Sequence, residues 1–238
     1  MNSYPYYLVK SISGNCDSFE PVYTGNFTQD TSRNPSKLKT EFAAYKKDDL
    51  LFIRIKCADY HPDQPEYFRL VFDPARSARR PHNLLQVRIH SDGRCNAGKM
   101  EYDIVHLKPV DGIFANIEKG DSTLDITVTV PLLLLHPQGK PEAIGFNMYR
   151  SARGELAKWS GYPSELCIHT LQGCGDLIFT DGLSDKEVDE LVKKITEDRN
   201  LYHTRWEKQS IPQELYRYYR PKKSGFSLRI KKSDVESV

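Results

Sequence analysis

The chain has 238 residues, of which 39% are hydrophobic and 28% are charged, and its formal net charge is +2. These values are ordinary for a globular protein and exclude a disordered or collagen-like chain. The long apolar run Val130–Leu135 is far shorter than the roughly 20 residues of a membrane-spanning helix, so we expect no membrane segment.

Short segments in which apolar and polar residues alternate dominate the chain from about residue 19 to residue 180. This period of two is typical of strands with one buried face. In Leu50–Cys57, for example, Ile53 and Ile55 fall on one side of the strand and Arg54 on the other. The strand candidates in chain order are Leu50–Cys57, Glu66–Phe72, Leu85–Ile89, Met100–Leu107, Gly112–Glu118, Leu124–Val130, Ala143–Arg150 and Asp176–Thr180.

Turn sequences such as Asp73-Pro74 and Ser91-Asp92-Gly93 separate these candidates, and no long helix is predicted between them. Eight to ten short strands joined in this way favour an antiparallel two-sheet β-sandwich of the jelly-roll type. A parallel nucleotide-binding sheet is disfavoured.

The pattern changes after Gly182. Ser184–Glu187 has the Ser-x-x-Glu spacing of a capping box, which marks a helix start. Apolar residues then follow at helical spacing and predict a helix over residues 185–199: Val188, Leu191, Val192 and Ile195. Residues 199–238 hold ten Lys and Arg against four Asp and Glu, a net +6 that leaves −4 for residues 1–198. We therefore predict a sandwich over residues 1–182 and a helical, basic and aromatic C-terminal extension over residues 183–238.

Several sequence blocks occur in an order that points to one family. These blocks are Thr40–Tyr45, Asp48–Ile55, Tyr67–Pro74, Leu85–Ile89, Asp92-Gly93, Thr129–Pro131, Gly145–Asn147, Trp159-Ser160 and Gly175–Phe179. Together they resemble the family 9 carbohydrate-binding modules, which share a jelly-roll-like fold with the DOMON domains. The resemblance implies a non-catalytic module that binds a saccharide or glycan on a sheet face or rim.

Within the resemblance, Gln86 and Arg88 match the family's ligand-contacting strand. Trp159 and Tyr162 are the aromatic candidates in the loop after Arg150, and Arg150 and Asn147 are candidates to line the same face. An arginine fork such as that of Arg88 suits adjacent hydroxyls or a carboxylate, and the rings of Trp159 and Tyr162 would stack on the sugar. Each residue also has an ordinary interpretation. Arg88 would be a solvated strand residue, Trp159 a core residue, and Asn147 and Arg150 partners of backbone groups in the closing loop.

One part of the family pattern is missing. In sugar-binding members two tryptophans clamp a pyranose ring, and the corresponding places here fall near Asp63 and near Cys167-Ile168, which are not aromatic. The clamp is therefore absent or rebuilt.

No cofactor and no metal site are expected, although calcium stays open. Four acidic residues around one strand offer the oxygen ligands that calcium prefers, without the spacing of an EF-hand: Asp59, Asp63, Glu66 and Asp73. Cys167, His169 and Cys174 lack the fourth ligand of a zinc site. Haem ligation through Met148 is disfavoured because its strand pattern places it in the core. The five cysteines form no Cys-x-x-Cys and are interpreted as buried free thiols.

Two other functions remain as alternatives. The C-terminal extension interleaves basic and aromatic residues, so the chain could be an interaction module for a protein or a nucleic acid. We favour instead a helical arm that packs on the acidic sandwich, and nucleic acid is a disfavoured partner. A carbohydrate-active enzyme of undefined chemistry is the second alternative, and no catalytic residue is assigned because no nucleophile elbow or phosphate loop is present.

No secretory signal is visible, so we expect a cytoplasmic protein, or an extracellular one if an upstream signal is missing from this sequence. The oligomeric state is not predicted.

Overall fold

The structure is a computed structural model that describes residues 5–12, 20–29, 34–76, 84–100, 107–160 and 174–208. Its elements are β1 (Tyr6–Ser11), β2 (Thr28–Gln29), β3 (Thr40–Lys47), β4 (Leu50–Cys57), β5 (Tyr67–Asp73), β6 (Leu85–His90), β7 (Cys95–Met100), β8 (Leu107–Pro109), β9 (Phe114–Lys119), β10 (Leu124–Pro131), the 3-10 turn η2 (Leu132–Leu134), β11 (Ala143–Ala152), β12 (Glu155–Lys158), β13 (Gly175–Phe179) and α1 (Asp185–Lys208). The prediction of a mainly β fold is confirmed.

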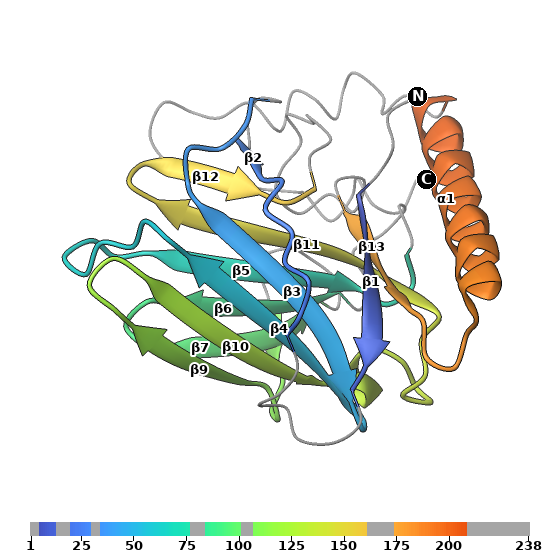
Figure 1. The fold of residues 1–238 in the computed structure, drawn as a ribbon, viewed down its shortest axis with the longest axis horizontal. Helices are drawn as coiled ribbons and strands as arrows, with labels where there is room; N and C mark the ends of the chain where they lie inside the picture. The colour runs from blue at the N-terminus through green and yellow to red at the C-terminus, as the bar shows by residue number, and fades with distance from the viewer. Residues whose placement is uncertain are drawn as a thin grey trace, which may run out of the picture.

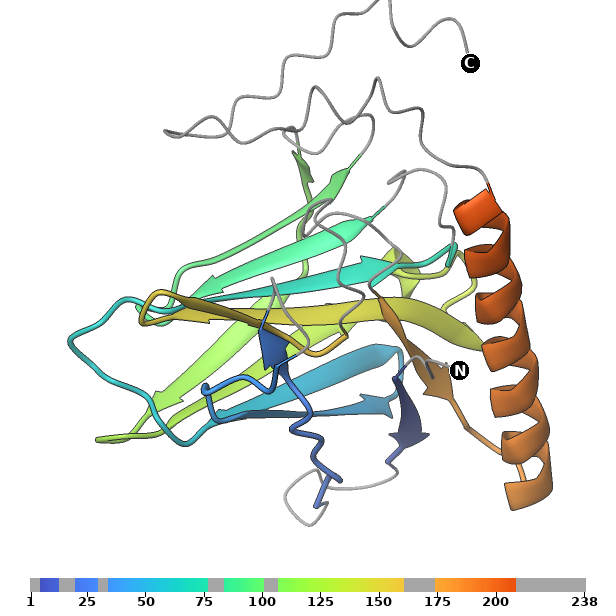
Figure 2. The same ribbon diagram turned by 90° about the horizontal axis from the view of Figure 1, so that it is seen from above.

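The strands form one continuous curled sheet in the order β8-β7-β6-β5-β11-β13-β1-β3-β4-β10-β9 (Figures 1 and 2). β12 adds to β11, and β2 adds to β12. The sheet is mixed rather than wholly antiparallel because β1 runs parallel to both of its neighbours. Tyr6–Val9 pairs with β13, and Lys10–Ser11 pairs with β3. β1 thus joins two halves of the sheet, β8-β7-β6-β5-β11-β13 on one side and β3-β4-β10-β9 on the other. These halves were expected to be two separate sheets.

The two halves face each other across one apolar core. Phe42 of β3 lies with its ring centroid 5.4 Å from that of Phe146 of β11 and 5.0 Å from that of Trp159. The period-two alternation of β4 and β10 places Ile53, Val128 and their alternate neighbours in the same core, each at most 2% exposed. Burying one such large side chain contributes about 1.5–3 kcal/mol, so this shared core is the main stabilising feature of the fold.

Helix α1 lies alongside β13 (Figure 1). The helix predicted over residues 185–199 is confirmed and runs on to Lys208. At the start of the helix, the structure shows one of the two contacts of the predicted capping box: the Glu187 carboxylate accepts from the Ser184 backbone N–H at 2.8 Å. The same carboxylate also accepts from the Ser184 hydroxyl at 2.6 Å. In residues 185–199 of the helix, for which burial is described, the buried side chains are those of Ile195 and Arg199. Within the described ranges no helix is both long and apolar enough to cross a bilayer.

Several expectations fall partly or wholly outside the described residues. The strand candidate Met100–Leu107 covers residues 101–106, which lie outside them, and the structure has β7 ending at Met100 and β8 beginning at Leu107. Most of the basic aromatic segment, residues 209–238, also lies outside.

Candidate functional site

One face of β5, β6 and β7 points away from the shared core. Arg69 of β5 lies directly opposite Arg88 of β6, which in turn lies opposite Asn96 of β7. Because directly opposed residues of antiparallel strands project from the same side of the sheet, these side chains share one surface. We call this surface the arginine face and define it by Tyr67, Arg69, Gln86, Arg88, His90 and Asn96.

Gln86 holds the centre of the arginine face. Its side-chain oxygen, oriented toward the two guanidiniums, accepts from Arg88 Nε at 2.6 Å, from Arg88 Nη2 at 3.2 Å and from Arg69 Nε at 3.2 Å. The opposite orientation of the amide would turn its N–H donors toward the guanidinium donors, so the oxygen-inward assignment is the one that satisfies the Gln86 amide. Gln86 is only 1% exposed, whereas Arg88 is exposed. A buried amide therefore fixes an arginine that faces solvent.

The rim of the arginine face carries rings and an amide. Tyr67 lies opposite His90, and their ring centroids are 6.4 Å apart with the planes tilted by 40°. Both rings are partly exposed, and Asn96 is exposed beside Arg88. Guanidinium donors, an amide and an aromatic ring on one open surface are the groups that pair with hydroxyls and pack against apolar C–H groups.

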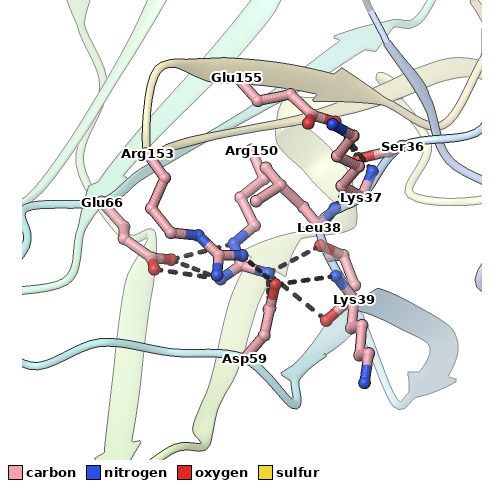
Figure 3. Close-up of polar contacts among 10 residues, drawn as sticks. Ser36, Lys37, Leu38, Lys39, Asp59, Glu66, Arg150, Arg153 and Glu155 are labelled. Atoms are coloured by element: carbon pink, nitrogen blue, oxygen red, sulfur yellow. Dashed lines mark hydrogen bonds and ion pairs between the residues drawn. The ribbon is translucent and has the colours of Figure 1, made fainter.

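Arg150 lies on the other side of the sheet, between the two halves. Figure 3 shows its guanidinium between Glu66 and Asp59. Nε donates to Glu66 Oε2 at 2.9 Å, Nη2 to Glu66 Oε1 at 3.1 Å and Nη1 to Asp59 Oδ1 at 2.6 Å. Nη1 also lies 3.1 Å from the Thr40 hydroxyl. Donors on all three nitrogens therefore have intramolecular acceptors, so that Arg150 ties β11 to β3 and to the β4–β5 connection.

The electrostatics of this cluster follow from the same contacts. Burial alone would raise the pKa of Asp59, but the hydrogen bonds and the charge of Arg150, together with Arg153 and the Lys39 N–H, lower it below its usual value. The carboxylates of Asp59 and Glu66, which sequence offered as calcium ligands, are thus occupied by arginine. In the part of the chain that the structure describes, no three His, Cys, Asp or Glu side chains are grouped to hold a metal.

Asn147 and Trp159 lie at the junction of β11 with the segment after β12. Asn147 shares its sheet face with Gln86, since Val71 lies opposite both. Its Nδ2 donates to the Ser160 carbonyl at 2.9 Å, and its Oδ1 accepts from the Ser160 N–H at 3.0 Å. Trp159 is 4% exposed and packs in the core, where a Cβ on Gly175 would come within 2.7 Å of its ring.

The structure thus brings together three of the predicted residues on one sheet face, namely Arg88, Gln86 and Asn147. It directs Arg150 and Trp159 to the opposite side, and Tyr162 lies outside the described residues. Sequence reasoning missed Arg69 and the Tyr67–His90 pair. The antiparallel register of β5 and β6 identifies them, because it sets Arg69 opposite Arg88.

No protein-family model matches the sequence, and no curated protein matches it significantly. Solved structures do match. A family 9 carbohydrate-binding module from Caldicellulosiruptor kristjanssonii in complex with cellotriose aligns with a TM-score of 0.53 and 11% identity, over 76% of this chain and 96% of that one. A family 9 module from the same organism in complex with glucose aligns with a TM-score of 0.52 and 10% identity, over 76% of this chain and 98% of that one. A candidate carbohydrate-binding protein from Bacteroides uniformis aligns with a TM-score of 0.55 and 10% identity, over 74% of this chain and 100% of that one. The chain therefore has the fold of the family 9 carbohydrate-binding modules, as its sequence blocks predicted.

Proposed function

We propose that this chain is a non-catalytic carbohydrate-binding module that holds a saccharide on the arginine face. The observation that carries the proposal is the contact between buried Gln86 and exposed Arg88. It fixes the arginine before a ligand arrives, so less side-chain entropy is lost on binding. The shared fold with modules solved in complex with cellotriose and glucose supports the same function.

The proposed roles follow the chemistry of each group. Arg88 donates to adjacent sugar hydroxyls, and Gln86 orients it. Because Arg88 is exposed, the guanidinium donors that do not contact Gln86 are assigned to the ligand. Tyr162 is proposed as the stacking ring, with Tyr67 at the rim. Asn147, Arg150 and Trp159 are proposed to support the face by holding β11 and the Ser160 backbone in place. We also infer that the two halves of the sheet act as the two layers of a sandwich.

Calorimetric titration with glucose, cellobiose, cellotriose and a wider glycan panel tests this proposal. We expect Arg88→Ala to weaken binding by about ten-fold or more, because a hydrogen bond from a charged donor contributes about 1.5–3 kcal/mol. The matched control is Arg54→Ala, which removes an arginine from the outward side of β4 in the other half of the sheet. Thermal melting confirms that each variant is folded.

Two results would overturn the proposal. The first is a folded protein that binds no saccharide of the panel at millimolar concentration. The second is equal weakening by Arg88→Ala and Arg54→Ala, which would place the ligand elsewhere.

The assignment of Tyr162 has its own test. Tyr162→Ala should weaken binding, whereas Tyr162→Phe keeps the ring and should leave most of the affinity, because stacking uses the face of the ring. Equal loss in both variants would show that the hydroxyl rather than the ring contacts the ligand.

A further inference from the structure

The arginine face is buried along one side and open along the other. One row of directly opposed residues on β5, β6 and β7 is buried: Val71, Gln86 and Gly98. The next row lies two residues away on each strand: Arg69, Arg88 and Asn96. Arg69 is half-buried, and Arg88 and Asn96 are exposed. The change from buried to open therefore falls between the same two rows on all three strands, so it runs across the strands rather than along them.

An apolar cluster covers the buried row. Its buried members are Val71, Leu84 and Tyr149, and Leu107 packs against them. Leu107 lies against Gly98, because a Cβ built on Gly98 would come within 2.7 Å of the Leu107 Cβ. Close-packed side chains of this kind leave no room for a ligand, so the cluster borders the open part of the face.

The open row ends differently on its two sides. At β11 it meets Tyr149, which lies opposite Arg69 and is 4% exposed. At β7 it ends at Asn96. β8 pairs with β7 only from Gly98 to Met100, so no strand among the described residues flanks Asn96. A ligand that contacts Arg88 can therefore extend toward the sheet edge at Asn96.

The open row is longer than one sugar. Neighbouring strands lie about 4.8 Å apart, so a row across β5, β6 and β7 extends about 10 Å. A single pyranose ring is shorter than this, whereas two linked rings fill it. The partly exposed rings of Tyr67 and His90 flank the row on β5 and β6. We call the open part of the face the open strip and define it by Tyr67, Arg69, Arg88, His90 and Asn96.

We infer that the open strip holds two linked sugar residues laid across β5, β6 and β7, and that Asn96 contacts the second of them; this inference rests on the proposed function. Arg88 holds the first residue. The Asn96 amide offers N–H donors and a carbonyl acceptor, so it pairs with hydroxyls in either role. Because the second residue is linked to the first, its contact with Asn96 costs little further translational freedom. The strip therefore selects an oligosaccharide over its monosaccharide.

Calorimetric titration of the full chain with saccharides of increasing length tests the inference. The probes are glucose, cellobiose and cellotriose, or the mono-, di- and trisaccharide of the repeating sugar that the glycan panel identifies. A second equivalent ring alone would improve the affinity about two-fold, and one added hydrogen bond contributes a further factor of about two to ten. We expect the disaccharide to bind about five-fold tighter than the monosaccharide or more, and the trisaccharide to add less than that.

Variants locate the second sugar residue. Asn96→Ala should leave the affinity for the monosaccharide unchanged and lower the disaccharide-to-monosaccharide ratio to about two. Arg88→Ala should weaken the binding of both probes. The matched control is Asn116→Ala, which removes an exposed amide from β9, the edge strand of the other half of the sheet, and should leave the ratio unchanged. Thermal melting confirms that each variant is folded.

The outcomes separate this inference from the proposed function. A disaccharide that binds at most about two-fold tighter than the monosaccharide would overturn the inference and leave the carbohydrate-binding function standing. An Asn96→Ala variant that keeps the full ratio, or that weakens both probes equally, would also overturn it, because Asn96 would then not contact the second residue. Failure of the folded chain to bind any saccharide would overturn both.

Discussion

Arg150 and Glu66 lie 84 positions apart in the sequence and form a two-armed ion pair in which neither side chain is exposed to solvent. Removing two charges from water costs several kcal/mol per ion, and their attraction offsets this cost only when the geometry is good and the remaining donors have acceptors. Here they do, since Asp59 and Thr40 accept from the third nitrogen of Arg150. The pair therefore fixes β11 against the connection that leads into β5, the strand that carries Arg69.

Breaking this pair from one side should destabilise the protein strongly. Arg150→Met leaves Glu66 as an uncompensated buried carboxylate, so we expect the free energy of unfolding to fall by about 3 kcal/mol or more. Urea denaturation followed by circular dichroism measures the change. The control is Arg153→Met, because Arg153 also contacts Asp59 but is partly exposed, and we expect a loss under about 1 kcal/mol. Similar losses in the two variants would show that the buried pair is not a stabilising contact.

Acid should weaken the same cluster in a defined way. The pKa of Asp59 is lowered in the folded protein, so its contribution to stability is fully present above its unfolded pKa of about 4 and is lost as the pH falls through the folded value. We expect Asp59→Asn to reduce the dependence of unfolding free energy on pH in this acidic range. Urea titrations at a series of pH values test this expectation.

The partner of Asp59 supplies the control for the acid experiment. In an Arg150→Met background the main cause of the lowered pKa is gone, so Asp59→Asn should then change the pH dependence little. An effect of Asp59→Asn that is equally large in both backgrounds would contradict the assignment to Arg150.

The sequence is sufficient to predict strands that bury one whole face. Leu50–Cys57 was predicted and coincides with β4, because every second residue enters the core. β1 was missed because only Val9 of its six residues is buried, so Tyr6–Ser11 shows no alternation. β12 was missed because its four residues form a short hairpin with the end of β11. The parallel pairing of β1 depends on contacts with distant strands that no local pattern contains.

Part of the candidate site could likewise be predicted from the sequence, and part could not. Gln86 and Arg88 share a strand, so their common face follows from a period of two. Arg69 lies beside them only because of the register in which β5 and β6 pair. The residues that connect these two strands do not determine that register, so the sequence could not predict the contact. The partner of Arg150 could not be predicted at all, because a buried ion pair over 84 positions leaves no periodic trace among the many acidic residues of the chain.

Docking of α1 should depend on one buried ion pair. Arg199 donates to both carboxylate oxygens of Asp176, at 3.1 Å and 2.5 Å, and to the Gly175 carbonyl at 3.3 Å. Arg199→Met leaves Asp176 with Arg76 as its remaining partner, so we expect a loss of about 2 kcal/mol and faster amide hydrogen exchange in α1 than in β4. The control is Lys194→Met, because the ion pair of Lys194 with Glu142 is exposed and should be worth under about 1 kcal/mol. Equal exchange in the two variants would contradict this role.

The thiols should differ in reactivity according to their burial. Burial raises the pKa of Cys57 and of Cys174 to about 12, and both are buried free thiols, as the sequence predicted for them. Because the thiolate is the reactive form and the raised pKa keeps both groups protonated at pH 8, these thiols should react very slowly. Cys95 is only partly buried, and burial raises its pKa as well.

We therefore expect iodoacetamide at pH 8 to modify Cys95 slowly in the native protein while Cys57 and Cys174 stay unmodified, and all three to react in urea. Peptide mass spectrometry after timed quenching measures each site. The reactivity of Cys174 also reports on the docking of α1, because Cys174 lies beside the Arg199–Asp176 pair, whose charges act on its pKa. If Arg199→Met loosens α1 as argued above, Cys174 should become reactive in that variant while Cys57 stays protected in the shared core. Equal protection of Cys174 in the wild-type and variant proteins would show that the helix does not control access to this thiol.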